Sequence, residues 1–110
     1  MARPYSPWLQ SVTIPSADTN VNLFTLLEAL DPEVPAHVQS ISIQVDIDEG
    51  AARVFVGNPD TLSATNYGAV LVATMEWSTG SHESNLIYLK DIELRADTST
   101  TRVNVSFIVR

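Results

Sequence analysis

The side chains that could hold a metal or carry out catalysis are few and far apart in this sequence. His37 and His82 stand in separate predicted loops, and neither has a second histidine close by. Zinc sites need further ligands at short spacing, and the chain has no cysteine to supply a thiolate, a disulfide or a nucleophile. We therefore expect no metal site and no bound cofactor.

Two groups of acidic residues are the other candidates for chemistry. Asp46 and Asp48 would point to one face of a strand, with Glu49 in the following turn; calcium could use such oxygens, but acids also simply favour turns. Asp91 and Glu93 would share a strand face, as paired carboxylates do in glycoside hydrolysis. That chemistry needs a deep cleft and a desolvated acid, which a domain this small has little room to provide. With no G-x-S-x-G motif and no glycine-rich phosphate loop, we predict that the chain is not an enzyme.

Large aromatic residues are better candidates for recognition. Aromatic side chains beside mobile backbone often anchor interfaces, and capping of the protein's own core is the alternative. Residues 1–8 contain two prolines and no periodic pattern, so they are predicted to form an arm that docks into a neighbour; Trp8 packing on its own sandwich is the other interpretation. The predicted partner-interface residues are Pro4, Tyr5, Trp8, Leu9 and Tyr67.

Length and charge limit the class of protein. The 110 residues fit one domain over residues 9–110 behind the arm. With 13 acidic against 6 scattered basic residues, the net charge of −7 argues against a nucleic-acid partner, because phosphates require clustered Lys and Arg. The N-terminus carries no apolar signal segment, and no apolar run reaches the ~18–20 residues of a membrane span. We expect a protein made in a cytoplasm that does not bind membranes.

Alternation of apolar and polar residues along most of the chain is typical of half-buried strands. A helical spacing of leucines occurs only over residues 22–30, where Asn20 or Asn22 could cap the start and Asp31-Pro32 ends the helix. The pattern predicts strands over residues 8–14, 38–48, 52–57, 69–77, 86–89, 92–95 and 102–109.

About seven to eight strands separated by turns predict an all-β fold: an antiparallel β-sandwich, jelly-roll-like, with one short helix. Strands 38–48 and 52–57 are predicted to pair across the turn Glu49-Gly50-Ala51. The apolar segment Ala69–Ala73 and an edge strand at Arg102–Arg110 would need cover, so we expect a homo-oligomer, either a dimer or a trimer.

Two stretches resemble a known group of proteins. Residues 53–61, with the loop returning to residues 67–71, follow the pattern of a strand, a glycine, an Asn/Asp turn and an apolar return strand. Residues 86–97 and 103–109 are similar to a closing pair of strands. Both patterns resemble small β-sandwich virion proteins of tailed bacteriophages, which decorate, cement or staple capsids.

The resemblance implies a capsid decoration protein whose partner is the major capsid protein. It also implies a location on the capsid exterior after synthesis in the host cytoplasm. The alternative function is a carbohydrate- or receptor-binding β-sandwich module in a tail or head fibre, since sandwiches display binding sites on their loops.

Overall fold

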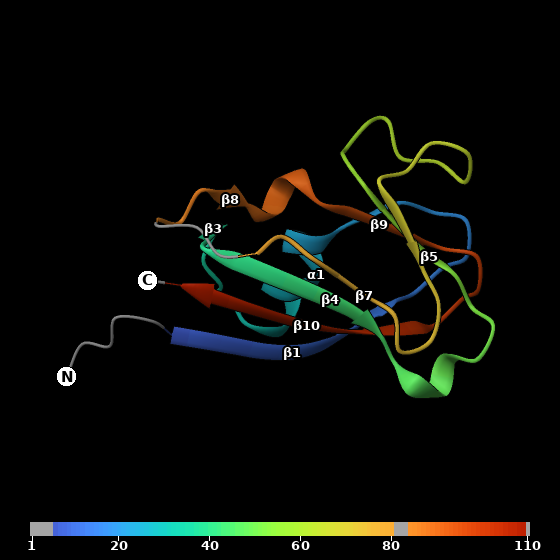
Figure 1. Cartoon of the computed structure of the whole chain (residues 1–110), viewed down its shortest axis with the longest axis horizontal. Coiled ribbons are helices and arrows are strands. Elements are labelled where there is room, and N and C mark those ends of the chain that lie inside the picture. Colours follow the sequence, from blue (N-terminus) through green and yellow to red (C-terminus); the bar gives the residue numbers. More distant parts are fainter. Residues whose placement is uncertain (1–5, 81–83, 110) are drawn as a thin grey trace.

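Two four-stranded antiparallel sheets pack face to face in the computed structural model, which describes residues 6–80 and 84–109 (Figure 1). Sheet A has the strand order β1-β10-β4-β7 and sheet B the order β2-β9-β5-β6. The strands of sheet A are β1 (Ser6–Ile14), β10 (Thr101–Val109), β4 (Ser40–Val45) and β7 (Glu76–Ser78). The strands of sheet B are β2 (Val21–Asn22), β9 (Glu93–Ala96), β5 (Val54–Gly57) and β6 (Ala69–Leu71).

The chain crosses repeatedly between the sheets, and this gives the topology of an eight-stranded jelly roll. Strands β1, β4, β7 and β10 belong to sheet A, and β2, β5, β6 and β9, which lie between them in sequence, belong to sheet B. A short pair, β3 (His37–Val38) with β8 (Ile87–Tyr88), extends one end of the sandwich. The predicted fold class, an all-β jelly-roll-like sandwich with one short helix, is confirmed.

The core lies between the sheets and is built from alternate residues of the strands. In β4 and β10 every second side chain is buried, because neighbouring residues of a strand point to opposite faces. Each fully buried Val, Leu, Ile or Phe side chain contributes roughly 1.5–3 kcal/mol. The inward residues of these two strands are Ile41, Ile43, Val45, Val103, Val105 and Phe107.

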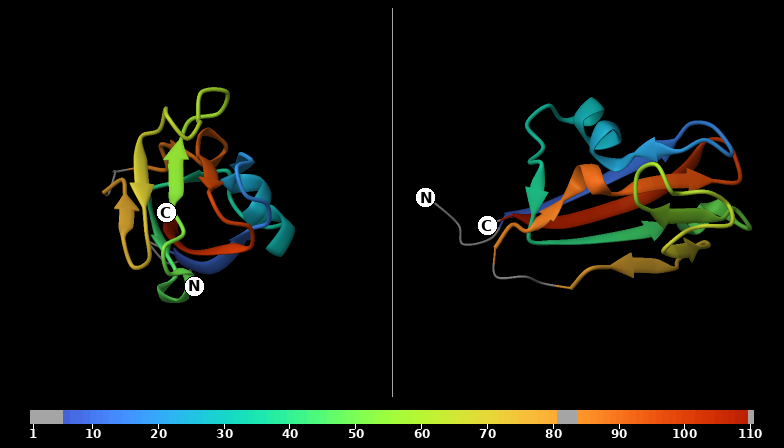
Figure 2. Two further views of the ribbon diagram at one scale, coloured as in Figure 1. Left: turned by 90° about the vertical axis from the view of Figure 1, so that its right-hand side faces the viewer. Right: turned by 90° about the horizontal axis from the view of Figure 1, so that it is seen from above.

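The α-helix α1 (Leu23–Leu30) lies outside the two sheets, as Figure 2 shows. Its predicted cap is confirmed, because the Asn22 side chain accepts hydrogen bonds from the backbone N–H groups of Phe24 and Thr25. Leu23 and Leu27 bury the apolar face of the helix against the sandwich. No helix in the described part of the chain is long and apolar enough to cross a membrane.

Three details of the predicted strands are wrong. Residues 69–77 do not form one strand: β6 and β7 belong to different sheets, and Thr74, with φ 68°, lies in the turn between them. Strands β4 and β5 do not pair across the 49–51 turn either, because the chain crosses there from sheet A to sheet B through the 3-10 helix η1 (Ile47–Glu49). Finally, β10 is no edge strand, since it pairs with both β1 and β4.

The first strand begins earlier than the sequence predicts. Ser6 pairs with Val109 and Trp8 with Phe107, so residues 6–8 belong to β1 and not to the predicted arm. The pairing with a nine-residue partner strand orders this segment despite Pro7, because Pro7 lies on an edge strand that has only one neighbour. Residues 1–5 of the predicted arm lie outside the described residues.

Candidate functional site

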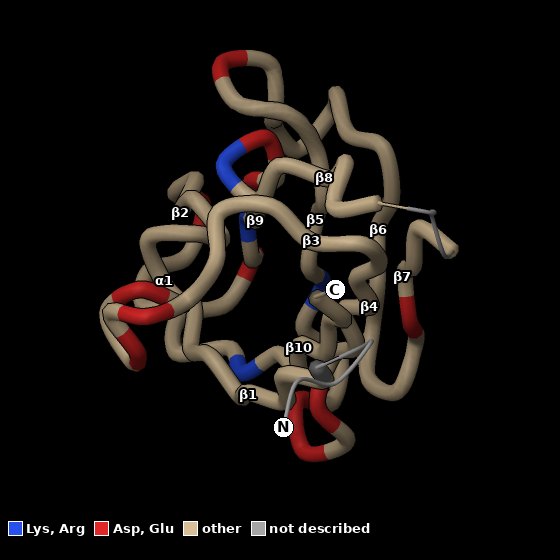
Figure 3. Tube along the Cα trace, turned by 90° about the vertical axis from the view of Figure 1, so that its left-hand side faces the viewer, with Lys and Arg blue, Asp and Glu red and all other residues tan. Residues whose placement is uncertain are grey.

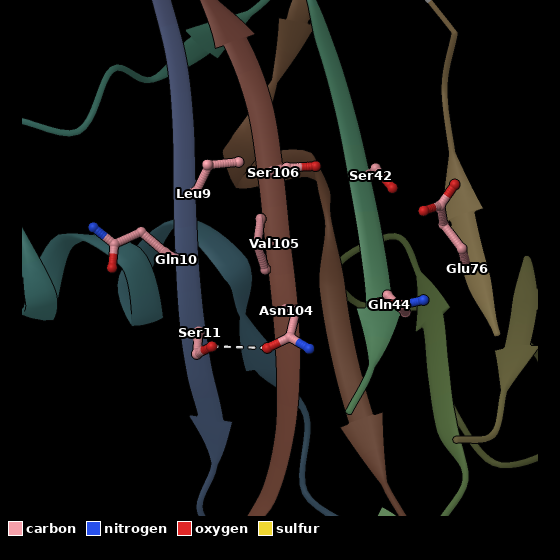
Figure 4. A pocket seen from close by; sticks show the side chains of 9 residues that line it. All are labelled: Leu9, Gln10, Ser11, Ser42, Gln44, Glu76, Asn104, Val105 and Ser106. Carbon is pink, nitrogen blue, oxygen red and sulfur yellow. Dashed lines mark hydrogen bonds between the residues drawn. The ribbon is translucent and has the colours of Figure 1, made fainter. Parts of the chain in front are cut away.

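The outward side chains of sheet A form a flat surface of small polar residues, shown in part in Figure 4. The strand register aligns them in rows across the sheet. One row is Leu9, Ser106, Ser42 and Ser78, and the next is Ser11, Asn104, Gln44 and Glu76. A third row, of Pro7, Ile108 and Ser40, spans three strands. We call these eleven residues the outer face of sheet A; the next outward pair along β1 and β10, Thr13 and Arg102, lies at its border.

Two shallow depressions adjoin on this face. Their volumes are about 290 and 380 Å³, and Leu9, Ser42 and Ser106 line both of them. The Leu9 side chain is 76% exposed, although a leucine gains free energy from burial. Pro7 and Ile108 lie in the neighbouring row, so the larger depression has an apolar border.

Internal hydrogen bonds hold three of the polar side chains in place. The Ser11 hydroxyl donates to Asn104 Oδ1 at 2.7 Å, as Figure 4 shows, and Asn104 Nδ2 donates to Asp46 Oδ1 at 3.1 Å. Gln44 Nε2 donates to the backbone oxygen of Thr74 at 3.2 Å. These side chains would lose little conformational freedom on binding a partner.

Four hydroxyl groups of the same face remain available. Within the described part of the chain, the side chains of Ser40, Ser42, Ser78 and Ser106 make no hydrogen bond. A hydroxyl can both donate and accept, so these groups can adapt to either kind of partner group. The face therefore combines fixed amides with free hydroxyls around one exposed leucine.

Charge is almost excluded from the outer face of sheet A, although the protein is strongly acidic. Glu76 is its single charged member. At its border, Asp46 lies 3.8 Å from Arg102, and the Asn104 amide, the Asp48 backbone N–H and Arg102 hold the pKa of Asp46 below its usual value. Figure 3 shows acidic positions elsewhere, including those at the end of α1. Depletion of charge is a property of interface centres.

The predicted partner-interface residues do not form one surface. Trp8 points inward and stacks on Phe107 of its own chain, with ring centroids 5.5 Å apart, whereas Leu9 projects from the outer face of sheet A. Tyr67 packs on Phe55 of sheet B, with ring centroids 5.0 Å apart. Pro4 and Tyr5 lie outside the described residues. The prediction missed Ser42, Gln44 and Ser106, whose only signal is their polar alternation in the strands.

The candidate metal and catalytic residues are placed apart. Asp91 belongs to the 3-10 helix η2 (Leu89–Asp91), whereas the Glu93 carboxylate accepts a hydrogen bond from Asn22 Nδ2 at 3.3 Å. His37 stacks on Tyr88 at 4.6 Å between centroids, and His82 lies outside the described residues. Among the residues that the structure describes, no three His, Asp or Glu side chains gather as a metal-binding group.

Comparisons with known proteins give one structural neighbour. No protein-family model matches the chain, and no curated protein matches it. Among solved structures, the chain is similar to "IMPa from Pseudomonas aeruginosa in complex with an O-glycopeptide", with 16% identity and a TM-score of 0.48. The match covers 94% of this chain and 12% of that one.

Proposed function

We propose that the protein is a capsid decoration protein that binds the lattice of a major capsid protein through the outer face of sheet A. The observation that supports this function is a surface with a single charged side chain, Glu76, around the exposed Leu9 on a protein whose net charge is −7. A rigid sandwich with such a face is suited to adhesion. Leu9 and Ile108 would supply apolar contact, and the serine hydroxyls would pair with backbone groups of the lattice.

The size of the face predicts how the protein binds. Four strands at about 4.8 Å spacing and three rows about 7 Å apart give an area of roughly 400 Å². A standard interface buries about 800 Å² on each partner. We therefore expect a single copy to bind weakly and further contacts to add affinity. Binding to the assembled lattice in preference to free subunits would stabilise the shell by mass action.

A homo-oligomer would supply such further contacts, and the edge of sheet A is the place for them. Strand β1 is nine residues long and, among the residues that the structure describes, pairs only with β10, so its other edge has no partner strand there. An unpaired strand edge is a template for pairing with another chain. We propose a dimer or a trimer, and light scattering that shows only a 12.0 kDa species at high concentration would contradict it.

The proposed function is tested on virions. Quantitative mass spectrometry of purified particles from the phage that carries the gene should find the chain in stoichiometric amounts, comparable to the capsid subunits. Recombinant protein should also cosediment with shells that lack it, and Leu9→Asp should abolish cosedimentation by placing an unpaired charge in the interface. Leu30→Asp is the matched control, because Leu30 is 56% exposed on α1, away from this face. Absence of the chain from virions would refute the proposal.

A further inference from the structure

A second concave site lies where the β5–β6 loop leaves sheet B. Two depressions of about 240 and 130 Å³ share Gly57, Asn58 and Gly68. Tyr67 lines the first, and Trp77 and Asp91 line the second. We call these six residues the loop cleft. It shares no lining residue with the outer face of sheet A. Together the depressions reach the lower end of the ~300–1,000 Å³ typical of small-ligand sites.

Hydrogen bonds fix the shape of this cleft without any ligand. Asn58 Nδ2 donates to the backbone oxygen of Asp91 at 3.0 Å, which ties the loop to η2. Asn66 Nδ2 donates to the Thr61 oxygen at 2.8 Å, and Gly68 N–H donates to the Val56 oxygen at 2.8 Å. A ligand would therefore meet a preorganised surface and incur little cost for ordering the loop.

The cleft combines aromatic rings with oxygen acceptors. Tyr67 packs on Phe55 and remains 44% exposed, and Trp77 is half-buried. Within the described residues, the Asp91 carboxylate has no hydrogen bond or ion pair, and the same holds for Asn58 Oδ1. The C–H faces of a sugar ring pack on aromatic rings, and its hydroxyls donate to carboxylate and amide oxygens.

The charged side chains around the loop cleft limit the class of ligand that it can bind. Within the described ranges, no Lys or Arg lines the loop cleft, and the neighbouring Lys90 places its ammonium 5.1 Å from the centre of the Phe24 ring instead. A phosphate, sulfate or carboxylate group would therefore meet only the negative Asp91. A calcium ion would meet a single carboxylate, that of Asp91, whereas calcium sites usually combine several carboxylate and carbonyl oxygens. We propose that the loop cleft binds a neutral saccharide, stacked on Tyr67 or Trp77 and hydrogen-bonded to Asp91 and Asn58.

The inference is tested by nuclear magnetic resonance on the full chain. The isotopically labelled protein is titrated with glucose, galactose, mannose, N-acetylglucosamine, maltose and lactose. At least one sugar should cause saturable shifts of the Gly57, Asn58 and Gly68 amides and of the Trp77 indole. The Trp8 indole is the internal control, because it stacks on Phe107 between the sheets. No saturable shift with any of these sugars, or shifts confined to other residues, would overturn the proposal.

Two variants show whether the contacts are the proposed ones. Asp91→Ala should weaken binding about tenfold or more, since hydrogen bonds to a charged group are strong ones. Asp48→Ala is the matched control, because it removes another exposed aspartate far from the cleft. Tyr67→Phe keeps the ring and its packing on Phe55, so it should leave the affinity nearly unchanged. Unchanged affinity in Asp91→Ala would contradict the assignment. Cosedimentation with capsids is expected to depend on Leu9 and not on the loop cleft. Failure of the saccharide proposal can therefore be distinguished from failure of the capsid proposal.

Discussion

The outer faces of the two sheets differ in whether the protein's own chain covers their apolar side chains. The outer face of sheet B carries Phe55, which is only 4% exposed because Tyr67 of the β5–β6 loop packs on it. The outer face of sheet A leaves Leu9 76% exposed, and no loop covers it within the described residues. One apolar side chain is thus buried by the protein's own chain, whereas the other stays exposed. The proposal that sheet A is the docking side rests on this difference.

The β5–β6 loop packs closely against sheet B. Leu62, which is 5% exposed, lies against Gly57, and a Cβ atom on Gly57 would come within 2.9 Å of Leu62 Cδ1. Asn20 Nδ2 donates to the Leu62 oxygen at 2.9 Å and fastens the loop to the β1–β2 connection. Phe55 and Leu62 are therefore both buried outside the main core, Phe55 beneath Tyr67 and Leu62 against Gly57.

The largest expected effect is the difference in stability between a variant of sheet B's outer face and a variant of sheet A's outer face. Phe55→Ala should lower the free energy of unfolding by about 3 kcal/mol, because it removes a buried ring and leaves a cavity. Leu9→Ala should change it by less than about 0.5 kcal/mol, since an exposed side chain contributes little to folding. Urea unfolding followed by circular dichroism measures both. Similar losses for the two variants would show that Leu9 is part of the protein's own packing, which would remove the argument for a docking face.

A smaller effect is expected from filling the space beside Gly57. Gly57→Ala should destabilise the protein by about 1–3 kcal/mol, because the added methyl group overlaps Leu62. In a Leu62→Ala background the same change should cost much less, and the double-mutant cycle gives the coupling between the two positions. Urea midpoints of the four proteins provide the measurement. An equal cost in both backgrounds would mean that the contact with Leu62 does not cause the loss.

The contrast between the faces also explains what the sequence could predict. Strict alternation in residues 38–48 and 102–109 predicts strands with one buried face, and the jelly-roll class follows from many such strands. The sheet to which each strand belongs could not be predicted from the sequence, because a short turn can either close a hairpin or cross between sheets. The break at residues 72–75 has no glycine or proline to announce it, since Thr74 itself adopts the left-handed conformation.

The candidate site was less predictable than the fold. Leu9 was predicted from its place near the terminus, but its polar neighbours become one surface only through the register of three further strands. Tyr67 was correctly predicted to lie in a loop. Nothing in the local sequence, however, predicts that its ring packs on Phe55 at the outer face of sheet B. Local pattern determines which side chains face outward, and long-range pairing determines which of them meet.

The smallest effect concerns an ion pair at one end of sheet B. The Arg53 backbone N–H and its guanidinium, which donate to Asp97 at 2.8 and 2.9 Å, hold the pKa of the Asp97 carboxyl below its usual value. A lowered pKa in the folded state stabilises the protein above the unfolded value of about 3.9, and this contribution is lost as the pH falls through the folded value. Because the Arg53 side chain is 58% exposed, we expect less than about 1 kcal/mol. Asp97→Asn should therefore reduce the loss of stability between pH 6 and pH 3, measured by urea unfolding, whereas Asp60→Asn, an exposed control, should not. An unchanged pH dependence in Asp97→Asn would show that the pair contributes nothing to acid sensitivity.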